Sequence, residues 1–248
     1  MNHKHLALPV YIQLQNNMKK IILIFLFIIP FSHHAQGFFT KEKVRNNPNF
    51  DKKQFSWGYY LGANVYDFNF DYINSVEEIE VDKGIGFNVG LIGNMRINDY
   101  LDLRLEPGVI FTTRNLTFPN FTEDKDKFRE VKSAYVHIPL LIKFSTKRIN
   151  NFKPFVVAGG SFATNLSSNE GNPDDNSAGE FRMESNAQFL EVGFGIDFYL
   201  EYFKFSPSIR GVFGLNDELI RDNDPNSPWT SNINKMKTRG IFINLSFQ

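Results

Sequence analysis

Stretches in which apolar and polar residues alternate, joined in turn by very short and by long polar connectors, constrain this chain most strongly. An alternation with a period of two puts successive side chains on opposite faces of a β-strand. In one stretch, Leu101, Leu103, Leu105, Val109 and Phe111 are interleaved with Asp102, Arg104 and Glu106. There are eight such stretches, and eight strands in up-and-down order predict an all-β, antiparallel sheet that closes into a barrel.

The other seven stretches follow the same scheme. Their apolar faces lie within residues 57–65, 85–91, 136–144, 155–166, 190–198, 203–213 and 241–247. Short turns are expected near 98–99, 146–151 and 200–201, and long polar loops at about 71–83, 114–132, 167–186 and 216–236. Both chain ends therefore fall on the short-turn side, as in bacterial outer-membrane barrels.

Two further features indicate that the apolar face meets lipid. Aromatic residues gather beside the short turns, where a membrane-interface girdle would need them: Tyr100, Phe144, Phe152, Phe198, Tyr199, Tyr202 and Phe203. The polar face carries both signs of charge: Arg104, Glu106, Lys143, Glu191, Asp197, Lys204 and Arg210. Such charges can pair inside a small barrel, so we predict a transmembrane barrel of the outer-membrane type in a Gram-negative bacterium. The architectural alternative is a soluble, lipocalin-like barrel released into the periplasm.

The N-terminus has the layout of a secretory signal. Lys19 and Lys20 precede an apolar run over residues 21–31, and the small residue Ala35 suits a cleavage site. We expect residues 1–17 to be an over-long gene start, 18–35 the signal peptide, 36–55 a basic periplasmic lead-in and 56–248 the barrel. No run of about 18 apolar residues follows the signal, so helical membrane spans are excluded.

Composition excludes several other classes of protein. Removing residues 1–35 takes away three lysines and no acids, which leaves 24 basic and 27 acidic residues and no basic excess for nucleic acid. The chain has no cysteine, and His137 is the only histidine after the signal, so thiolate and most zinc chemistry are excluded. We expect no cofactor, no metal site and no small-molecule substrate.

His137 is the one residue that could support catalysis, because some outer-membrane lipid hydrolases use a histidine and a serine. Ser133 is four residues away on the same strand, about 13 Å, which is too far to be its partner. Ser206 or Ser208 would have to reach it from across the barrel. We therefore predict a buried, hydrogen-bonded histidine and no catalytic residues.

Other motifs have simple structural interpretations. Residues 222–226 have the spacing of a calcium loop, but Ser227 replaces the required glycine and Ile233 the closing glutamate. Gly84, Gly86 and Gly90 match no nucleotide motif and would relieve crowding inside a small barrel. The acidic clusters at 77–82 and 170–180 are predicted to be solvated outer loops.

One segment resembles a known family, and two others resemble a wider group of proteins. Asn47-Pro48-Asn49-Phe50-Asp51-Lys52-Lys53, running into Trp57-Gly58-Tyr59-Tyr60-Leu61-Gly62, resembles the mature N-terminus of the PorT family, called SprT in gliding bacteria. Residues 135–144 and 153–161 resemble segments of a wider group of outer-membrane barrels. The resemblance implies an integral outer-membrane protein required for type IX secretion and, in gliding species, motility. No catalytic residues come with it.

The hypothesis is thus a non-enzymatic barrel, embedded in outer-membrane lipid, that supports other components of type IX secretion. The alternative is a small structural or adhesive barrel of the OmpX type that binds surfaces through its acidic loops. A lesser alternative is an outer-membrane lipid hydrolase that uses His137.

Overall fold

The computed structural model describes residues 45–74 and 78–248. The predicted gene start, signal peptide, cleavage site and first part of the lead-in lie outside the described residues, as does Glu77. Among the described residues, no helix is long and apolar enough to cross a membrane. The elements are η2 (Phe50–Lys52), β1 (Phe55–Tyr72), β2 (Glu80–Lys83), β3 (Ile85–Arg96), β4 (Leu101–Leu105), β5 (Gly108–Thr117), α3 (Asp124–Lys127), β6 (Phe128–Ser145), β7 (Phe152–Asn165), η3 (Asn176–Ala178), β8 (Asn186–Tyr199), β9 (Lys204–Gly214) and β10 (Ile233–Phe247).

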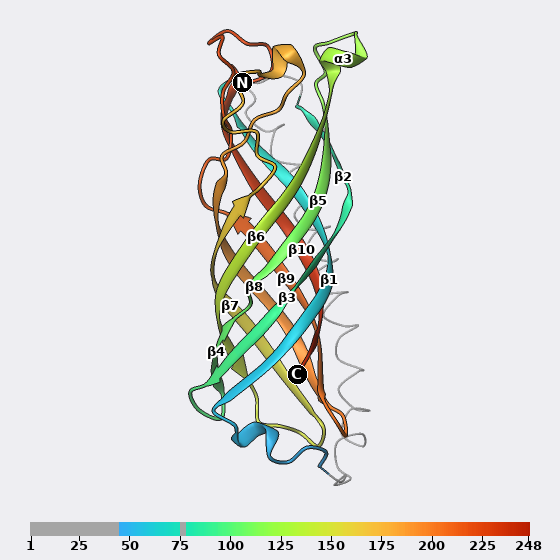
Figure 1. Ribbon diagram of the computed structural model, residues 1–248, viewed down its shortest axis with the longest axis vertical. Coiled ribbons are helices and arrows are strands. Elements are labelled where there is room, and N and C mark those ends of the chain that lie inside the picture. Colours follow the sequence, from blue (N-terminus) through green and yellow to red (C-terminus); the bar gives the residue numbers. More distant parts are fainter. Residues whose placement is uncertain (1–44, 75–77) are drawn as a thin grey trace, which may run out of the picture. The chain divides into compact units, whose positions relative to one another are not determined.

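The ten strands occupy eight positions around a closed antiparallel barrel (Figure 1). β4 and β5 keep one register against β3 and β6, and Pro107, which has no N–H to donate, separates them. β2 continues the line of β3 along β5, with its pairing shifted by one residue. Pairing of β1 with both β3 and β10 closes the ring, which confirms the predicted eight-stranded, up-and-down barrel.

The predicted inner and outer faces are confirmed. Apolar side chains on the outer wall are exposed, among them Leu91, Ile142 and Phe194. All seven charged residues assigned to the inner face are buried. One aromatic residue differs from the prediction, because Tyr199 points inward and is 2% exposed, whereas its neighbour Phe198 faces out. Tyr199 therefore belongs to the filling of the barrel and not to the interfacial girdle.

The strands run further at the long-loop end than predicted. β6 begins at Phe128 and β10 at Ile233, inside segments that the sequence pattern predicts to be loops. There the pattern inverts: Val131 and Met236 are buried while Lys132 and Lys235 are exposed. The barrel thus extends beyond the apolar band into water, where the ordinary apolar-in arrangement returns.

Glycines make room for a tyrosine inside the barrel. A Cβ atom at Gly90 would lie 2.6 Å from the ring of Tyr60, and one at Gly108 would lie 2.2 Å from its hydroxyl oxygen. Because both distances are far below contact, only glycine fits at these facing positions of β3 and β5. The prediction that glycines on the inner face relieve crowding is therefore confirmed for Gly90.

Candidate functional site: the buried charges and the two ends of the barrel

A chain of charged residues crosses the middle of the barrel. Arg104 Nη1 lies 3.2 Å from Glu106 Oε1, and Arg210 Nη2 lies 2.5 Å from Glu106 Oε2. The other arm of Arg210 lies 2.8 Å from Glu191 Oε2, and Glu191 Oε1 is 2.7 Å from His137 Nε2. We call these five residues the central ion network. Each carboxylate meets a cation or a ring nitrogen, as buried charges require.

A second group lies nearer the short turns. Lys143 Nζ is 2.6 Å from Asp197 Oδ2, and Lys204 Nζ is 3.9 Å from the same oxygen. Ser206 Oγ donates a hydrogen bond of 2.6 Å to Asp197 Oδ1. The Lys143 ammonium also sits 4.0 Å from the centre of the Phe155 ring. One aspartate is thus shared by two lysines and a serine, which favours a structural role.

The geometry around His137 fits the predicted buried, hydrogen-bonded histidine, which is 1% exposed. Ser133 accepts a hydrogen bond from Arg114 and Ser206 donates to Asp197, so neither serine is bonded to His137. In the described part of the chain, no group of three or more His, Cys, Asp or Glu residues could hold a metal ion. The network therefore offers paired charges but no nucleophile prepared by a base.

Another buried charge was not singled out from the sequence. Arg114, 0% exposed, donates to the hydroxyl oxygens of Thr238, Ser133 and Tyr135, and its guanidinium stacks 3.8 Å from the centre of the Phe68 ring. Thr238 in turn donates to Glu218 through its hydroxyl and its N–H, at 2.8 and 2.9 Å. Burial raises the pKa of Glu218 above its ordinary value. Alternation in 108–117 could have placed Arg114 inside, had the strand been extended beyond Phe111.

The long-loop end is closed by a packed apolar cluster, which we call the outer cap. Its buried members come from several strands and from the loops between them: Phe68, Leu116, Phe118, Val131, Phe181, Met183, Leu219, Ile233 and Met236. α3 lies at the same end of the barrel, and η2 lies at the opposite end (Figure 1). Long loops that the sequence predicts to be solvated thus contribute a core of their own.

Hydrogen bonds tie the cap loops to one another. Trp229 Nε1 donates to Asp126 O at 2.9 Å, and its ring stacks on Phe121 with 4.7 Å between centres. Arg129 Nε donates to Asn176 Oδ1 at 3.2 Å. The loop after β9 is therefore fixed to α3 and the loop before β8 to β6, and bonds of Asn176 to Asp222 and of Asn223 to Asp175 join the two loops into one ordered surface.

Carboxylates of the predicted loop motifs take part in this arrangement. Asp222 Oδ1 accepts from Asn176 of the loop before β8, and its other oxygen accepts from Ser227, so both oxygens of this carboxylate are used within the cap. Asp175 is 6% exposed and accepts from the N–H of Asn223 at 2.9 Å. It is an exception to the predicted solvated cluster, whereas Glu170 is exposed as predicted.

At the short-turn end, the described part of the lead-in is docked on the barrel. Asn46 Nδ2 donates to Tyr199 O at 3.1 Å, and the Tyr199 hydroxyl donates to Asp51 at 2.5 Å. Arg148 lies 3.4 Å from Asp51 and stacks on the Tyr199 ring at 3.8 Å. Lys204 sits 4.5 Å from the centre of the Phe50 ring. Residues 46–51 thus close this mouth of the barrel.

The closed barrel, its exposed apolar band and its buried charges define an outer-membrane β-barrel protein. A family model described as "Outer membrane protein beta-barrel domain" matches residues 35–219, well over half of the chain. The chain belongs to this family, and it is an outer-membrane protein. No protein of curated function matches the sequence.

Several solved structures are similar in outline. OprG of Pseudomonas aeruginosa shares 14% identity, with 78% of this chain and 93% of that chain covered and a TM-score of 0.41. Neisserial surface protein A shares 12% identity, with 78% and 98% covered and a TM-score of 0.41. Ail, the attachment invasion locus protein of Yersinia pestis, shares 14% identity, with 79% and 99% covered and a TM-score of 0.38.

Proposed function

We propose that this protein is a non-enzymatic outer-membrane barrel whose function resides in its outer cap, a surface held ready to bind at the cell exterior. The interlocked cap is the observation that carries the proposal. Loops that are already ordered lose less conformational entropy on binding, which favours affinity. The filled interior supports a structural role for the barrel itself, as a platform that holds the cap above the membrane.

The test compares surface attachment of four strains: the parent, a clean in-frame deletion, and the deletion complemented with either Trp229→Ala or Trp57→Ala. The variant removes the ring stack and the hydrogen bond to α3 but touches no residue of the lipid band. We expect attachment to fall in the deletion strain and in the variant at equal outer-membrane levels. Trp57→Ala, which changes the chain's other tryptophan at the far end, should restore attachment. Unchanged attachment in the deletion strain would refute the proposal.

A second candidate function is the support of type IX secretion, which the resemblance in residues 47–53 implies. One observation favours it: the described part of this segment is fixed at the short-turn mouth, with Pro48, Asn49 and Lys52 left exposed. A fixed, exposed surface on the periplasmic side suits contact with another component of a secretion apparatus.

This candidate is tested by mass spectrometry of secreted and periplasmic proteins after in-frame deletion. If the protein is a secretion component, proteins bearing type IX C-terminal domains should accumulate unprocessed in the periplasm of the deletion strain. Lys52→Glu, which changes only an exposed side chain of the lead-in, should reproduce the defect, whereas Lys235→Glu on the outer surface should not. Normal secretion in the deletion strain would remove this candidate and leave the first one standing.

A further inference from the structure

A charged hollow of about 230 Å³ lies at the short-turn mouth of the barrel, between the lead-in, the turn after β3 and the turn before β7. Five of its seven lining residues are cations: Arg45, Arg96, Lys147, Arg148 and Lys153. The other two are the carboxylates Asp51 and Asp99, so the hollow has a formal charge of plus three. We call it the basic pocket.

The basic pocket lies on the inner side of the barrel rim. Arg96 is two residues beyond the buried Asn94 on β3, and Lys153 is two residues before the buried Phe155 on β7. Side chains two apart on a strand share a face, so both cations continue the inner face. Arg148 stacks on the inward Tyr199 ring. The pocket therefore faces water at the mouth and not lipid.

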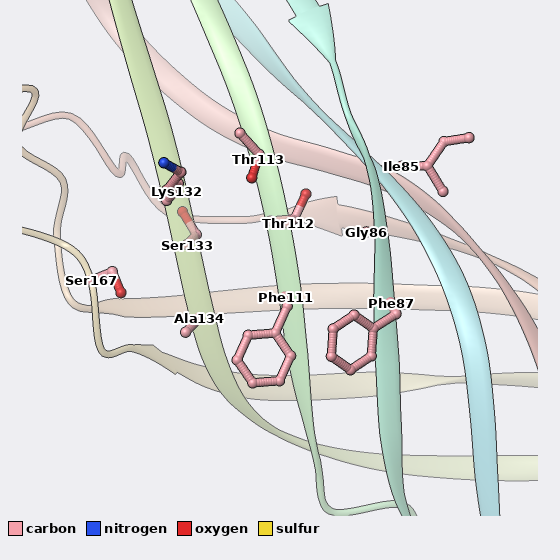
Figure 2. A pocket seen from close by; sticks show the side chains of 10 residues that line it. All are labelled: Ile85, Gly86, Phe87, Phe111, Thr112, Thr113, Lys132, Ser133, Ala134 and Ser167. Carbon is pink, nitrogen blue, oxygen red and sulfur yellow. The ribbon is translucent and has the colours of Figure 1, made fainter.

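A larger hollow on the outer wall differs in this respect. Figure 2 shows the Phe87 and Phe111 rings side by side there, over β3 and β5. Both rings are exposed on the wall, and their contact with lipid is the one that any outer-membrane barrel makes. The basic pocket is thus the hollow whose lining is specific to this chain.

Three of the five cations have no carboxylate partner in the described part of the chain. Arg96 pairs with Asp99, and Arg148 lies 3.4 Å from Asp51. Lys153 Nζ donates only to the carbonyl oxygen of Asp99, at 3.4 Å. The side chains of Arg45 and Lys147 make no hydrogen bond or ion pair to another described residue. Charges of one sign gathered in a hollow raise the local potential and concentrate counter-ions.

The charge and the size of the pocket select the kind of anion. A phosphate monoester brings about 1.5–2 negative charges and three acceptor oxygens, whereas a carboxylate brings one charge. Arginine matches phosphate oxygens two at a time, and lysine binds phosphate as a point charge. Sites for drug-sized ligands occupy roughly 300–1,000 Å³. A pocket of about 230 Å³ is smaller, so it suits a small anionic group.

We propose that the basic pocket binds the phosphate or diphosphate group of a water-soluble molecule. Arg45, Lys147 and Lys153 contact its oxygens. Arg148 keeps its ion pair with Asp51 and donates to Asn151 Oδ1 at 2.8 Å, which holds the lead-in against the turn and gives the pocket its wall. The site lies at the opposite end of the barrel from the outer cap and does not depend on the proposed function.

The test is isothermal titration calorimetry of the purified full-length protein in nonionic detergent, with inorganic pyrophosphate as the probe. Wild type should bind one pyrophosphate per barrel. Lys147→Glu, which reverses an exposed charge of the pocket, should weaken binding at least tenfold. The matched control is Lys52→Glu, an exposed residue of the lead-in outside the pocket, which should leave binding nearly unchanged. Equal binding by Lys147→Glu and wild type, or equal loss in both variants, would overturn the proposal.

A second variant keeps the test valid if Lys147→Glu loses the gel shift on boiling that reports a folded barrel. Arg45→Gln alters only an exposed side chain of the lead-in and should weaken pyrophosphate binding severalfold. Binding at the wild-type level by Arg45→Gln would show that this guanidinium does not contact the anion and that the proposed site is wrong.

Two other anions distinguish the chemistry and its source. Acetate should bind wild type at least tenfold more weakly than pyrophosphate, and equal affinity would show that the pocket does not select phosphate. Phosphatidylglycerol mixed into the micelles should not compete with pyrophosphate, because the pocket faces water inside the rim. Competition by this lipid would assign the pocket to a membrane headgroup and overturn the proposal.

Discussion

The residues of the central ion network stabilise the folded barrel only when all of them are present. Glu191, 0% exposed, holds both Arg210 and His137, and its removal would leave their hydrogen bonds unmade in a buried place. Breaking a buried ion pair by removing one partner is destabilising by about 3–5 kcal/mol. We predict that Glu191→Ala lowers the free energy of unfolding by about that amount.

Unfolding by urea in lipid vesicles measures this, with Gln188→Ala as the control on the same strand. Gln188 is exposed and faces outward, away from the central ion network, so its variant should unfold like wild type. A Glu191→Ala barrel of wild-type stability would show that the network contributes nothing to the fold.

Whether a given side chain faces lipid can be tested by substituting an arginine at that position of the outer wall. Ile196 faces outward within the apolar band of β8. Arginine facing lipid near the midplane is unfavourable by about 2–4 kcal/mol, and Leu103→Arg on β4 should behave in the same way. Gln188→Arg, at an outward position that is already polar, should be tolerated better. Normal insertion of both band variants, measured by the shift in gel mobility on boiling, would show that the outward assignment is wrong.

Glu218 gives the outer cap a pH dependence with a definite sign. Burial raises the pKa of this carboxyl in the folded protein. Its stabilising contribution is thus complete below the ordinary glutamate value of about 4.3 and is lost as the pH rises through the raised pKa. We predict that the cap loosens with rising pH in wild type and that Glu218→Gln removes this trend.

Hydrogen exchange at the Thr238 amide, which donates to Glu218, reports this loosening directly. Wild type and Glu218→Gln are compared at each pH so that the intrinsic rate of exchange cancels. The same slope in both proteins would mean that another group controls the cap.

Which face of a strand carries the apolar residues depends on the medium outside the barrel wall. Within the band, β6 has apolar residues outside and His137 and Lys143 inside, because lipid replaces water as the outer medium. Beyond the band, the same strand has Val131 inside and Lys132 outside. One continuous strand therefore carries two opposite patterns, joined near Ala134.

This inversion explains what could be predicted from the sequence. Within the band, the alternation of apolar and polar residues correctly predicts all eight strand positions and the buried charges. There, successive side chains point to opposite faces and the apolar face is the outer one. The extensions of β6 and β10 were predicted as loops because their outward residues are polar. Contacts between distant loops, such as Trp229 with Asp126, leave no local pattern, and alternation alone does not show the one-residue shift in pairing between β2 and β3 along β5.

The cap loops should behave as one unit. Trp229→Ala removes the stack on Phe121 and the bond to Asp126, which together fix residues 215–232 against α3. We predict that limited proteolysis of intact cells then cleaves this loop much faster, while the boiling-dependent gel shift of the barrel is kept. Cleavage at the wild-type rate would show that the cap is held elsewhere.

The barrel as a whole has a filled interior and two different ends. The central ion network and the Lys143–Asp197–Lys204 group fill its middle, the outer cap covers one end and residues 46–51 close the other. A pore is therefore not the function that this arrangement supports. What the molecule presents on each side of the membrane is a fixed protein surface.

Because the chain has no cysteine, labelling of single introduced cysteines directly measures which of the two surfaces faces the cell exterior. Single-cysteine variants are labelled with a membrane-impermeant maleimide in intact cells and again after the outer membrane is permeabilised. We predict that Asp174→Cys, in an outer loop, is labelled in intact cells and Lys147→Cys, in a short turn, only after permeabilisation. Ser206→Cys, inside the barrel, should resist labelling in both. Labelling of Lys147→Cys in intact cells would show that the short turns face the cell exterior and that the predicted orientation is wrong.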